Sequence, residues 1–249
     1  MKIIIYILLL STLLFSNETR MVYFYATDTN INNFKSLKIS FDNYLHKMGD
    51  YEFQPFDKKE TFEKNLTPQN MLVILSSWHY IQIANQYNLN AVLVASKDNN
   101  IKDTKILVGQ KNMPINGVVT SAYDKDYTSK LLHQFNTDLS VLIVPKELDA
   151  LMSVGFGMSN FALVSKDSFN LLKEVNPTLA NNLTIYNESK PTYRMMLAYH
   201  GEISKNKKLI DIFENMGLKD DGKEVLNQIG IDKFILFPSQ DLEQIRRAR

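Results

Sequence analysis

The amino-acid sequence predicts an α/β fold built mostly of parallel strands. Segments with strand character alternate with segments of helical periodicity along most of the 249 residues, which is typical of parallel sheets covered by helices. Residues 71–75 (MLVIL) are apolar at every position, as expected of a strand buried on both faces. With 45% apolar and 22% charged residues the composition is that of a globular protein, and the strands are too many for one small sheet.

In the first part of the chain the pattern changes repeatedly from strand to helix. Residues 21–26 (MVYFYA) predict a strand, which the turn-forming residues 27–30 end. Apolar residues then recur at spacings of three and four from Phe34 to Met48, which predicts a helix that Gly49 ends. The next predicted elements are a strand at 51–56, a short charged helix at 58–66, a strand at 71–75 and a helix around 78–87.

The same alternation continues through the rest of the chain. Further predicted strands lie at 91–95, 105–108, 117–120, 139–144, 160–164, 183–186 and 193–199. Further predicted helices lie at 124–135, 146–154, 167–175, 205–216 and 221–229. For the arginine-rich end, residues 246–249, we expect a frayed and solvated terminus rather than a functional basic tail.

The N-terminus carries the pattern of a secretory signal. Lys2 precedes the largely apolar residues 3–15, a stretch shorter than the roughly 20 residues needed to cross a bilayer. Ser16 supplies a small residue for cleavage, although Leu14 fits the small-x-small preference poorly. We therefore expect residues 1–16 to be a cleaved signal peptide and the mature protein to be periplasmic. An uncleaved membrane anchor is the alternative.

Charge and cysteine content exclude several classes of protein. The 28 Lys and Arg residues nearly cancel the 27 Asp and Glu residues, so no overall field attracts nucleic acid or an acidic membrane surface. Cysteine is absent, which excludes disulfides, thiolate metal sites, a cysteine nucleophile and a lipidated N-terminal cysteine. An exported protein without disulfides depends on its core alone, which this length allows.

Two pairs of hydroxyl-bearing residues stand where predicted strands give way to helices. Ser76 and Ser77 form the first pair, and Thr120 and Ser121 form the second. Ligands of open α/β sheets lie outside the carboxyl ends of the strands, where helix N-termini favour anions. We therefore expect the four side chains to converge on one ligand-binding cleft. The alternative is that the serines only cap the helices.

Thr27 and three aromatic residues extend this candidate site. Thr27 follows the first strand and is a third candidate for ligand binding. Its neighbour Asp28 would repel a phosphate. The alternative role of Asp28 is to cap a helix. Trp78, Tyr80 and Tyr123 flank the hydroxyl pairs and offer ring faces to an organic part of a ligand. Packing in a core is the alternative role of these three aromatic residues.

Catalytic and metal-binding motifs are weak. His46, His79, His133 and His200 do not show the spacing of a paired metal site. Ser77 and His79 are close in sequence, but no third orienting group or G-x-S-x-G elbow accompanies them, so an exported hydrolase is a minor alternative. No phosphate-binding P-loop and no G-x-G-x-x-G motif occur. We therefore expect no enzyme activity, no metal and no cofactor.

Four segments carry a likeness to a known family. They are residues 41–49 (FDNYLHKMG), 73–80 (VILSSWHY), 144–172 and 221–231 (DGKEVLNQIGI). In this order and spacing they resemble the periplasmic substrate-binding proteins of ABC transporters, in the phosphate, phosphite and phosphonate group with the type 2 periplasmic-binding-protein fold. The resemblance covers most of the chain after the signal.

The resemblance implies two α/β lobes joined by two crossing strands, with a ligand held as the lobes close. It places the crossings near residues 94–97 and 186–191. Lobe one is then expected at residues 17–95 and 188–249, and lobe two at residues 96–187.

The resemblance also adds Ser159 and Asn160 to the candidate ligand-binding residues. The family typically carries an aspartate where Asn160 stands. Its hydroxyl-rich loop in lobe two is shortened here to Thr120 and Ser121. Both departures bear against phosphonate as the ligand.

Signal, fold pattern and resemblance together predict an exported solute-binding protein. We expect it to capture one small solute, with a phosphate-like or phosphonate-like oxyanion as the candidate, and to hand it to an ABC permease. We expect a monomer with no nucleic-acid partner. A ligand-sensing partner of a membrane receptor or kinase has the same fold and is the alternative.

Overall fold

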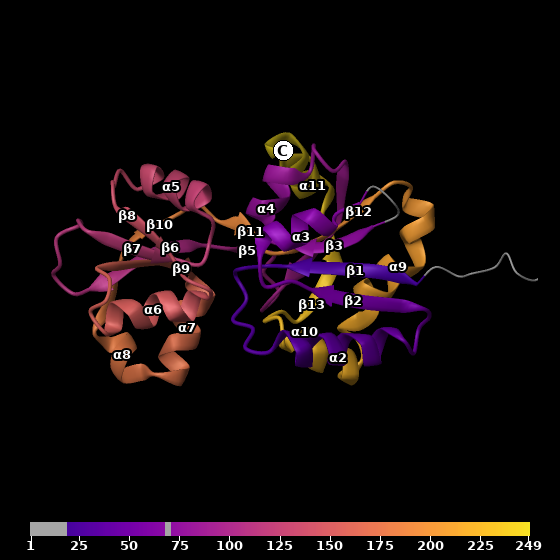
Figure 1. The fold of residues 1–249 in the computed structure, drawn as a ribbon, viewed down its shortest axis with the longest axis horizontal. Coiled ribbons are helices and arrows are strands. Elements are labelled where there is room, and N and C mark those ends of the chain that lie inside the picture. Colours follow the sequence, from indigo (N-terminus) through magenta and orange to yellow (C-terminus); the bar gives the residue numbers. More distant parts are fainter. Residues whose placement is uncertain (1–18, 68–70) are drawn as a thin grey trace, which may run out of the picture.

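The computed structural model describes residues 19–67 and 71–249, which form two sheets covered by helices on both faces (Figure 1). We call the six-stranded sheet with its helices lobe one, and the five-stranded sheet with its helices lobe two. The predicted signal peptide lies outside the described residues. Within the described residues, no helix is both long enough and apolar enough to cross a membrane.

Lobe one contains the first and last parts of the described chain. Its strands lie in the order β13-β4-β12-β3-β1-β2. They are β1 (Arg20–Tyr25), β2 (Tyr51–Pro55), β3 (Leu72–Leu75), β4 (Leu89–Ser96), β12 (Met196–His200) and β13 (Lys233–Leu236). The helices are α2 (Phe34–Leu45), α3 (Lys59–Asn65), α4 (Ser77–Ile83), α9 (Ile203–Met216), α10 (Asp220–Asn227) and α11 (Ser239–Ala248). Helices α2 and α10 cover one face of the sheet, and α3, α4 and α11 cover the other (Figure 1).

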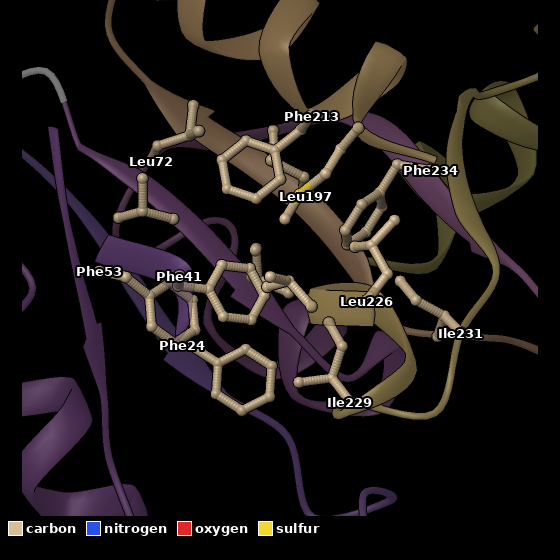
Figure 2. Close-up of a cluster of buried hydrophobic side chains, with 14 of the residues drawn as sticks. Phe24, Phe41, Phe53, Leu72, Leu197, Phe213, Leu226, Ile229, Ile231 and Phe234 are labelled. Atoms are coloured by element: carbon tan, nitrogen blue, oxygen red, sulfur yellow. The ribbon is translucent and has the colours of Figure 1, made fainter. Parts of the chain in front are cut away.

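Aromatic packing holds α2 against its sheet. The helix begins where the Asn33 side chain accepts a hydrogen bond from the Ser36 amide, and its spacing of three and four turns Leu37 and Phe41 inward. The Phe41 ring stacks on Phe53 with centroids 3.9 Å apart. Figure 2 shows this pair within a cluster that also takes in Phe213 from α9. The cluster joins N-terminal and C-terminal segments into one core.

Lobe two contains the middle of the chain. Its strands lie in the order β10-β6-β9-β7-β8. They are β6 (Lys105–Gln110), β7 (Val118–Ser121), β8 (Ser140–Ile143), β9 (Phe161–Ser165) and β10 (Leu183–Glu188). The helices are α5 (Lys125–Gln134), α6 (Glu147–Gly155), α7 (Lys166–Val175) and α8 (Pro177–Asn181). Helix α5 lies on one side of the sheet, and α6, α7 and α8 lie on the other (Figure 1).

The predicted α/β fold is confirmed, but the sheets are mixed rather than mostly parallel. Strand β1 is parallel to β2 and β3, and β7 is parallel to β8 and β9. By contrast, β12 is antiparallel to β3 and β4, and β6 is antiparallel to β9 and β10. The reason is the double crossing. The chain leaves lobe one on β4 and returns on β12 at the same end of the sheet, so these neighbours must run in opposite directions.

Two crossing segments, residues 97–104 and 189–195, join the lobes. Each carries a short strand, β5 (Lys102–Asp103) and β11 (Thr192–Tyr193), and the two strands pair antiparallel with each other. Figure 1 shows them between the two lobes. The segments begin later than residues 94 and 186 because β4 continues to Ser96 and β10 continues to Glu188.

The last part of the chain differs most from expectation. Strand β13 and helix α11 were not predicted, and residues 246–248 are helical rather than frayed, although residues 246–249 are exposed to solvent as expected. Ile245 of α11 is buried in lobe one, and Arg249 donates a hydrogen bond from Nη1 to the Leu89 carbonyl at 3.0 Å. Helix α11 is therefore held to lobe one through Ile245 and Arg249.

Candidate functional site

Polar contacts close the boundary between the lobes, which we call the seam. Lys59 of α3 holds Asp124 of lobe two with Nζ 2.6 Å from Oδ2. The Asn30 side chain, in the loop after β1, donates to Ser168 Oγ at 2.9 Å and accepts from the Leu148 amide at 3.1 Å. Each of these contacts joins elements of different lobes, so the structure represents a closed form.

A second set of contacts ties both crossing segments to lobe two. Asp167, at the start of α7, accepts from Arg194 Nη1 at 2.7 Å and lies 3.2 Å from Lys97 Nζ. Arg194 also donates from Nε to the Asn100 carbonyl at 3.0 Å. Burial alone would raise the pKa of Asp167, but Arg194 and Lys97 outweigh it and lower the pKa. This carboxylate is therefore ionised at neutral pH.

Trp78 crosses the seam from lobe one. Its side chain belongs to α4 but packs in the lobe-two core with Leu107 and Val119. The indole stacks on Tyr127 of α5, with centroids 5.4 Å apart and planes 15° apart. Within residues 19–67 and 71–249, the buried indole Nε1 has no hydrogen-bond partner. Trp78 therefore lies at the seam inside a hydrophobic core, so the structure favours core packing over a ligand-facing role.

A cavity of about 440 Å³ opens along the seam. Asp28 from the loop after β1, Asp103 and Arg194 from the crossing segments, and Asp167 from α7 line it. The loop at residues 227–231 closes one side. The cavity therefore lies where the carboxyl end of a lobe-one strand meets the start of a lobe-two helix, the usual position of a ligand in α/β proteins.

A buried cation stands beside this cavity. The Lys105 side chain is 4% exposed, and its Nζ lies 3.9 Å from Asp28 Oδ2 and 3.8 Å from Asp103 Oδ2. Burial by itself lowers the pKa of Lys105, but the carboxylates of Asp28, Glu147 and Asp103 outweigh it and raise the pKa. Lys105 therefore carries a full positive charge. Burial raises the pKa of Asp103.

Glu147 forms the lobe-two wall of this charged cluster. The side chain is fully buried and accepts hydrogen bonds from the Ser165 amide at 2.7 Å, from Ser165 Oγ at 2.5 Å, and from the hydroxyls of Ser168 and Tyr123. Burial raises the pKa of Glu147. The Tyr123 ring in turn faces Lys105, with Nζ 5.2 Å from the ring centroid.

The predicted lobe-one hydroxyls lie at the seam, but each has a partner. Ser76 Oγ donates to Asp28 Oδ1 at 2.5 Å. Ser77 Oγ donates to the Tyr193 carbonyl of the second crossing segment at 2.5 Å. The Thr27 hydroxyl is buried and has no partner in the described part of the chain. This side of the site therefore offers one unused hydroxyl and one carboxylate.

The predicted lobe-two hydroxyls are used inside lobe two. Thr120 Oγ1 lies 3.1 Å from the Ser159 hydroxyl, 3.1 Å from the Phe161 carbonyl and 3.2 Å from the Ala150 carbonyl. Ser121 Oγ accepts from the Tyr123 amide and the Thr128 hydroxyl, each at 3.1 Å. Both side chains are fully buried. The structure therefore does not bring them to the seam as ligand donors beside Ser76 and Ser77.

Asn160 and Tyr80 also serve the fold. Asn160 Oδ1 accepts from the Val118 amide at 2.9 Å, at the amino end of the parallel pair β7 and β9 and away from the seam. Tyr80 is fully buried in the core of lobe one, where its hydroxyl donates to the Leu89 carbonyl at 3.2 Å and accepts from the Ala91 amide at 3.3 Å. For Tyr80, core packing is the role that the structure favours.

The structure does not arrange Ser77 and His79 as the hydrolase hypothesis requires. His79 Nε2 pairs with Glu63 Oε1 at 2.8 Å, while Ser77 points to the Tyr193 carbonyl. Burial lowers the pKa of His79, so the ring is neutral and donates to Glu63. Among the residues that the structure describes, no group of three or more histidine or carboxylate side chains is arranged to hold a metal ion.

Several residues of the seam were not found from the sequence. Lys59, Asp124, Asp167 and Arg194 meet only because distant elements fold together, so local patterns carry no sign of them. Lys105 did leave a signal. It is a charged residue at the start of the apolar run KILVG, in a strand whose next four residues are buried.

Comparison with known proteins places the fold in a defined group. Residues 50–242 match the family model described as ABC transporter, phosphonate, periplasmic substrate-binding protein. Among curated protein sequences, no relative matches the chain.

Solved structures are similar at low sequence identity. A binding protein component of an ABC phosphonate transporter from Pseudomonas aeruginosa has a TM-score of 0.69 and 14% identity, covering 93% of this chain and 86% of its own. PhnD1 from Prochlorococcus marinus, in complex with methylphosphonate, has a TM-score of 0.71 and 14% identity, with 92% and 97% covered. A Xanthomonas citri protein bound to ATP has a TM-score of 0.70 and 10% identity, with 92% and 96% covered. These likenesses show the type 2 periplasmic-binding-protein fold.

Proposed function

Because this chain belongs to the family of periplasmic substrate-binding proteins of phosphonate ABC transporters, we propose that it captures a small oxyanion of phosphonate or phosphate type between its lobes. The observation that carries the proposal is the closed seam. Both lobes and both crossing segments contribute side chains to one cavity of about 440 Å³, beside the buried ammonium of Lys105. A monomer with one such cavity, handing its ligand to a membrane permease, fits the family.

The proposed binding residues are those that the seam brings together. From the predicted set they are Thr27, Ser76 and Ser77. The division into residues 17–95 with 188–249 and residues 96–187 is proposed as the boundary between two units that move apart to release the ligand. Residues 1–16 are proposed as the signal that exports the chain to the periplasm.

Isothermal titration of the purified protein with methylphosphonate and inorganic phosphate tests the proposal, with glycine as a solute that lacks a phosphorus oxyanion. We expect binding of at least one oxyanion and none of glycine. A ligand at 100 times its Kd also stabilises the protein by about 2.7 kcal/mol, which a thermal melt detects. Heat changes and melts that stay flat for both oxyanions would overturn the proposal.

A further inference from the structure

We infer that Lys105 is the residue that selects a negatively charged oxygen, by donating hydrogen bonds from its buried ammonium to the ligand in the closed form. The inference rests on the proposed function and names the group that recognises the oxyanion.

The first argument is the unfilled hydrogen-bonding capacity of the ammonium. A lysine ammonium has three N–H donors, and charge-assisted N–H···O bonds to carboxylates are about 2.7–2.9 Å long. The nearest carboxylate oxygens to Lys105 Nζ lie at 3.8 and 3.9 Å, beyond hydrogen-bond length. In the part of the chain that the structure describes, Nζ makes no hydrogen bond. A buried charged donor without acceptors costs free energy, so an acceptor is needed there.

The other lysines of the seam provide the comparison. Lys59 Nζ lies 2.6 Å from Asp124 Oδ2, and Lys146 Nζ donates to Asn32 Oδ1 at 2.6 Å. Both are less buried than Lys105, yet each has a short contact across the seam. Lys105 is therefore the seam lysine whose donors are free to take a ligand.

The second argument is position. Asp28 and Asp103 both line the cavity, and both lie within 3.9 Å of Lys105 Nζ, so the ammonium stands at the cavity edge. The Tyr123 ring covers its other side. An oxygen that reaches the ammonium from the cavity must therefore pass between the carboxylates of Asp28 and Asp103.

The charge balance restricts the ligand. Asp28, Asp103 and Glu147 place three carboxylates around one ammonium, so each negative charge on a ligand is repelled by them, and a dianion is repelled more strongly than a monoanion. Asp28 is already held by the Ser76 hydroxyl, and Glu147 by the hydroxyls of Ser165, Ser168 and Tyr123. The ligand that fits is a singly charged phosphonate or phosphate monoester rather than a dianion.

Titration of three forms of the purified protein with methylphosphonate tests the role. Lys105→Met keeps the length of the side chain but removes the charge, and we expect binding to weaken at least tenfold. Lys105→Arg keeps the charge and should bind within tenfold of the original protein. Lys47→Met is the charge control, because Lys47 pairs with Asp221 on the exposed surface of lobe one and should leave binding unchanged.

A further variant guards against misfolding. Lys105→Met leaves buried carboxylates without their positive partner, which could destabilise the fold. The double variant Lys105→Met with Asp103→Asn therefore removes one negative charge together with the positive charge of Lys105. We expect this folded variant also to lose at least tenfold in affinity. If the original protein binds methylphosphonate and either charge-removed variant binds it equally well, the role of Lys105 is wrong while the proposed function stands. If the original protein binds neither methylphosphonate nor inorganic phosphate, both fail.

Discussion

The indole of Trp78 lies parallel to the phenol ring of Tyr127, with centroids 5.4 Å apart and planes 15° apart, although the two residues belong to different lobes. Trp78 is the only tryptophan of the sequence and is 3% exposed. Opening of the lobes must separate the rings and bring the indole into water. The fluorescence of this protein therefore reports directly on closure.

The first prediction concerns Tyr127→Ala. We expect the closed form to lose the stacking contribution of about 0.5–1.5 kcal/mol, and the emission maximum of Trp78 to move to longer wavelength as the indole gains water. Tyr186→Ala is the matched control, because Tyr186 pairs with Phe161 inside lobe two. The control should lower the melting temperature without moving the emission. Equal emission spectra for both variants would contradict this prediction.

The second prediction concerns acid pH. Burial alone would raise the pKa of Asp124, but its hydrogen bonds from Lys59 and the Tyr127 amide outweigh burial and lower the pKa. An acid with a lowered pKa stabilises the closed form fully above its ordinary value near 3.8, and the stabilisation is lost as pH falls through the lowered value. We expect the seam to loosen below that value, seen as a red shift of Trp78 emission.

Asp124→Asn supplies the comparison for that experiment. The amide does not titrate, so the variant should show the loosened emission at neutral pH and a smaller change on acidification. The cost at neutral pH should be about 1 kcal/mol, since this ion pair is only partly exposed. Far-UV circular dichroism separates lobe opening from unfolding. A variant with the same acid response as the original protein would count against the Lys59–Asp124 contact.

The third prediction concerns the pH dependence of ligand affinity. Burial raises the pKa of Asp103, Asp167 raises it further, and Lys105 and Arg194 oppose this. Protonation of Asp103 removes one negative charge beside the ligand site, and this lowers the repulsion of an anionic ligand. We expect the affinity for methylphosphonate to increase as pH falls toward the raised pKa of Asp103.

Asp103→Asn separates this effect from the ligand's own ionisation. The variant should bind at least as tightly as the original protein at neutral pH. It should keep only the pH dependence that methylphosphonate itself brings. Titrations at several pH values measure how the affinity for methylphosphonate changes with pH in each protein. If the change is the same in the variant and the original protein, Asp103 has no titrating role.

The fourth prediction concerns the C-terminal helix. Asp241 of α11 accepts from the Tyr193 hydroxyl at 2.7 Å and pairs with Lys102 Nζ at 2.9 Å, so one carboxylate holds both crossing segments. We expect Asp241→Ala to destabilise the protein by about 1 kcal/mol and to speed amide hydrogen exchange in β5 and β11. Glu243→Ala, which breaks a contact within α11 only, is the control and should leave that exchange unchanged.

Local patterns in the sequence were enough for most of the fold. The spacing of Phe34, Leu37 and Phe41 predicts α2, because a helix places these residues on one face. Helix α11 was missed, although Pro238 precedes it and Leu242 and Ile245 stand three residues apart. Its apolar stripe is short, and charged residues surround it. Propensity alone is a weak guide for such a helix.

Fewer features of the candidate site than of the fold could be predicted from the sequence. Placement after a strand predicted Ser76 and Ser77 at the seam, and they lie there. The same reasoning misjudged Thr120 because position in a strand does not reveal which neighbouring group the hydroxyl will meet. Lys105 left one local sign, its charge at the start of an apolar run, whereas the role of Asp103 depends on contacts with other parts of the chain.

The paired crossing strands determine how this molecule can deform. Thr192 lies opposite Asp103, and Tyr193 lies opposite Lys102, so the two connections behave as one ribbon instead of two independent tethers. A ribbon bends readily across its face but resists shear between its edges, since shear would break the ladder hydrogen bonds. The lobes therefore retain one soft degree of freedom. We therefore expect closure to bring Lys59 back to Asp124 and Trp78 back to Tyr127.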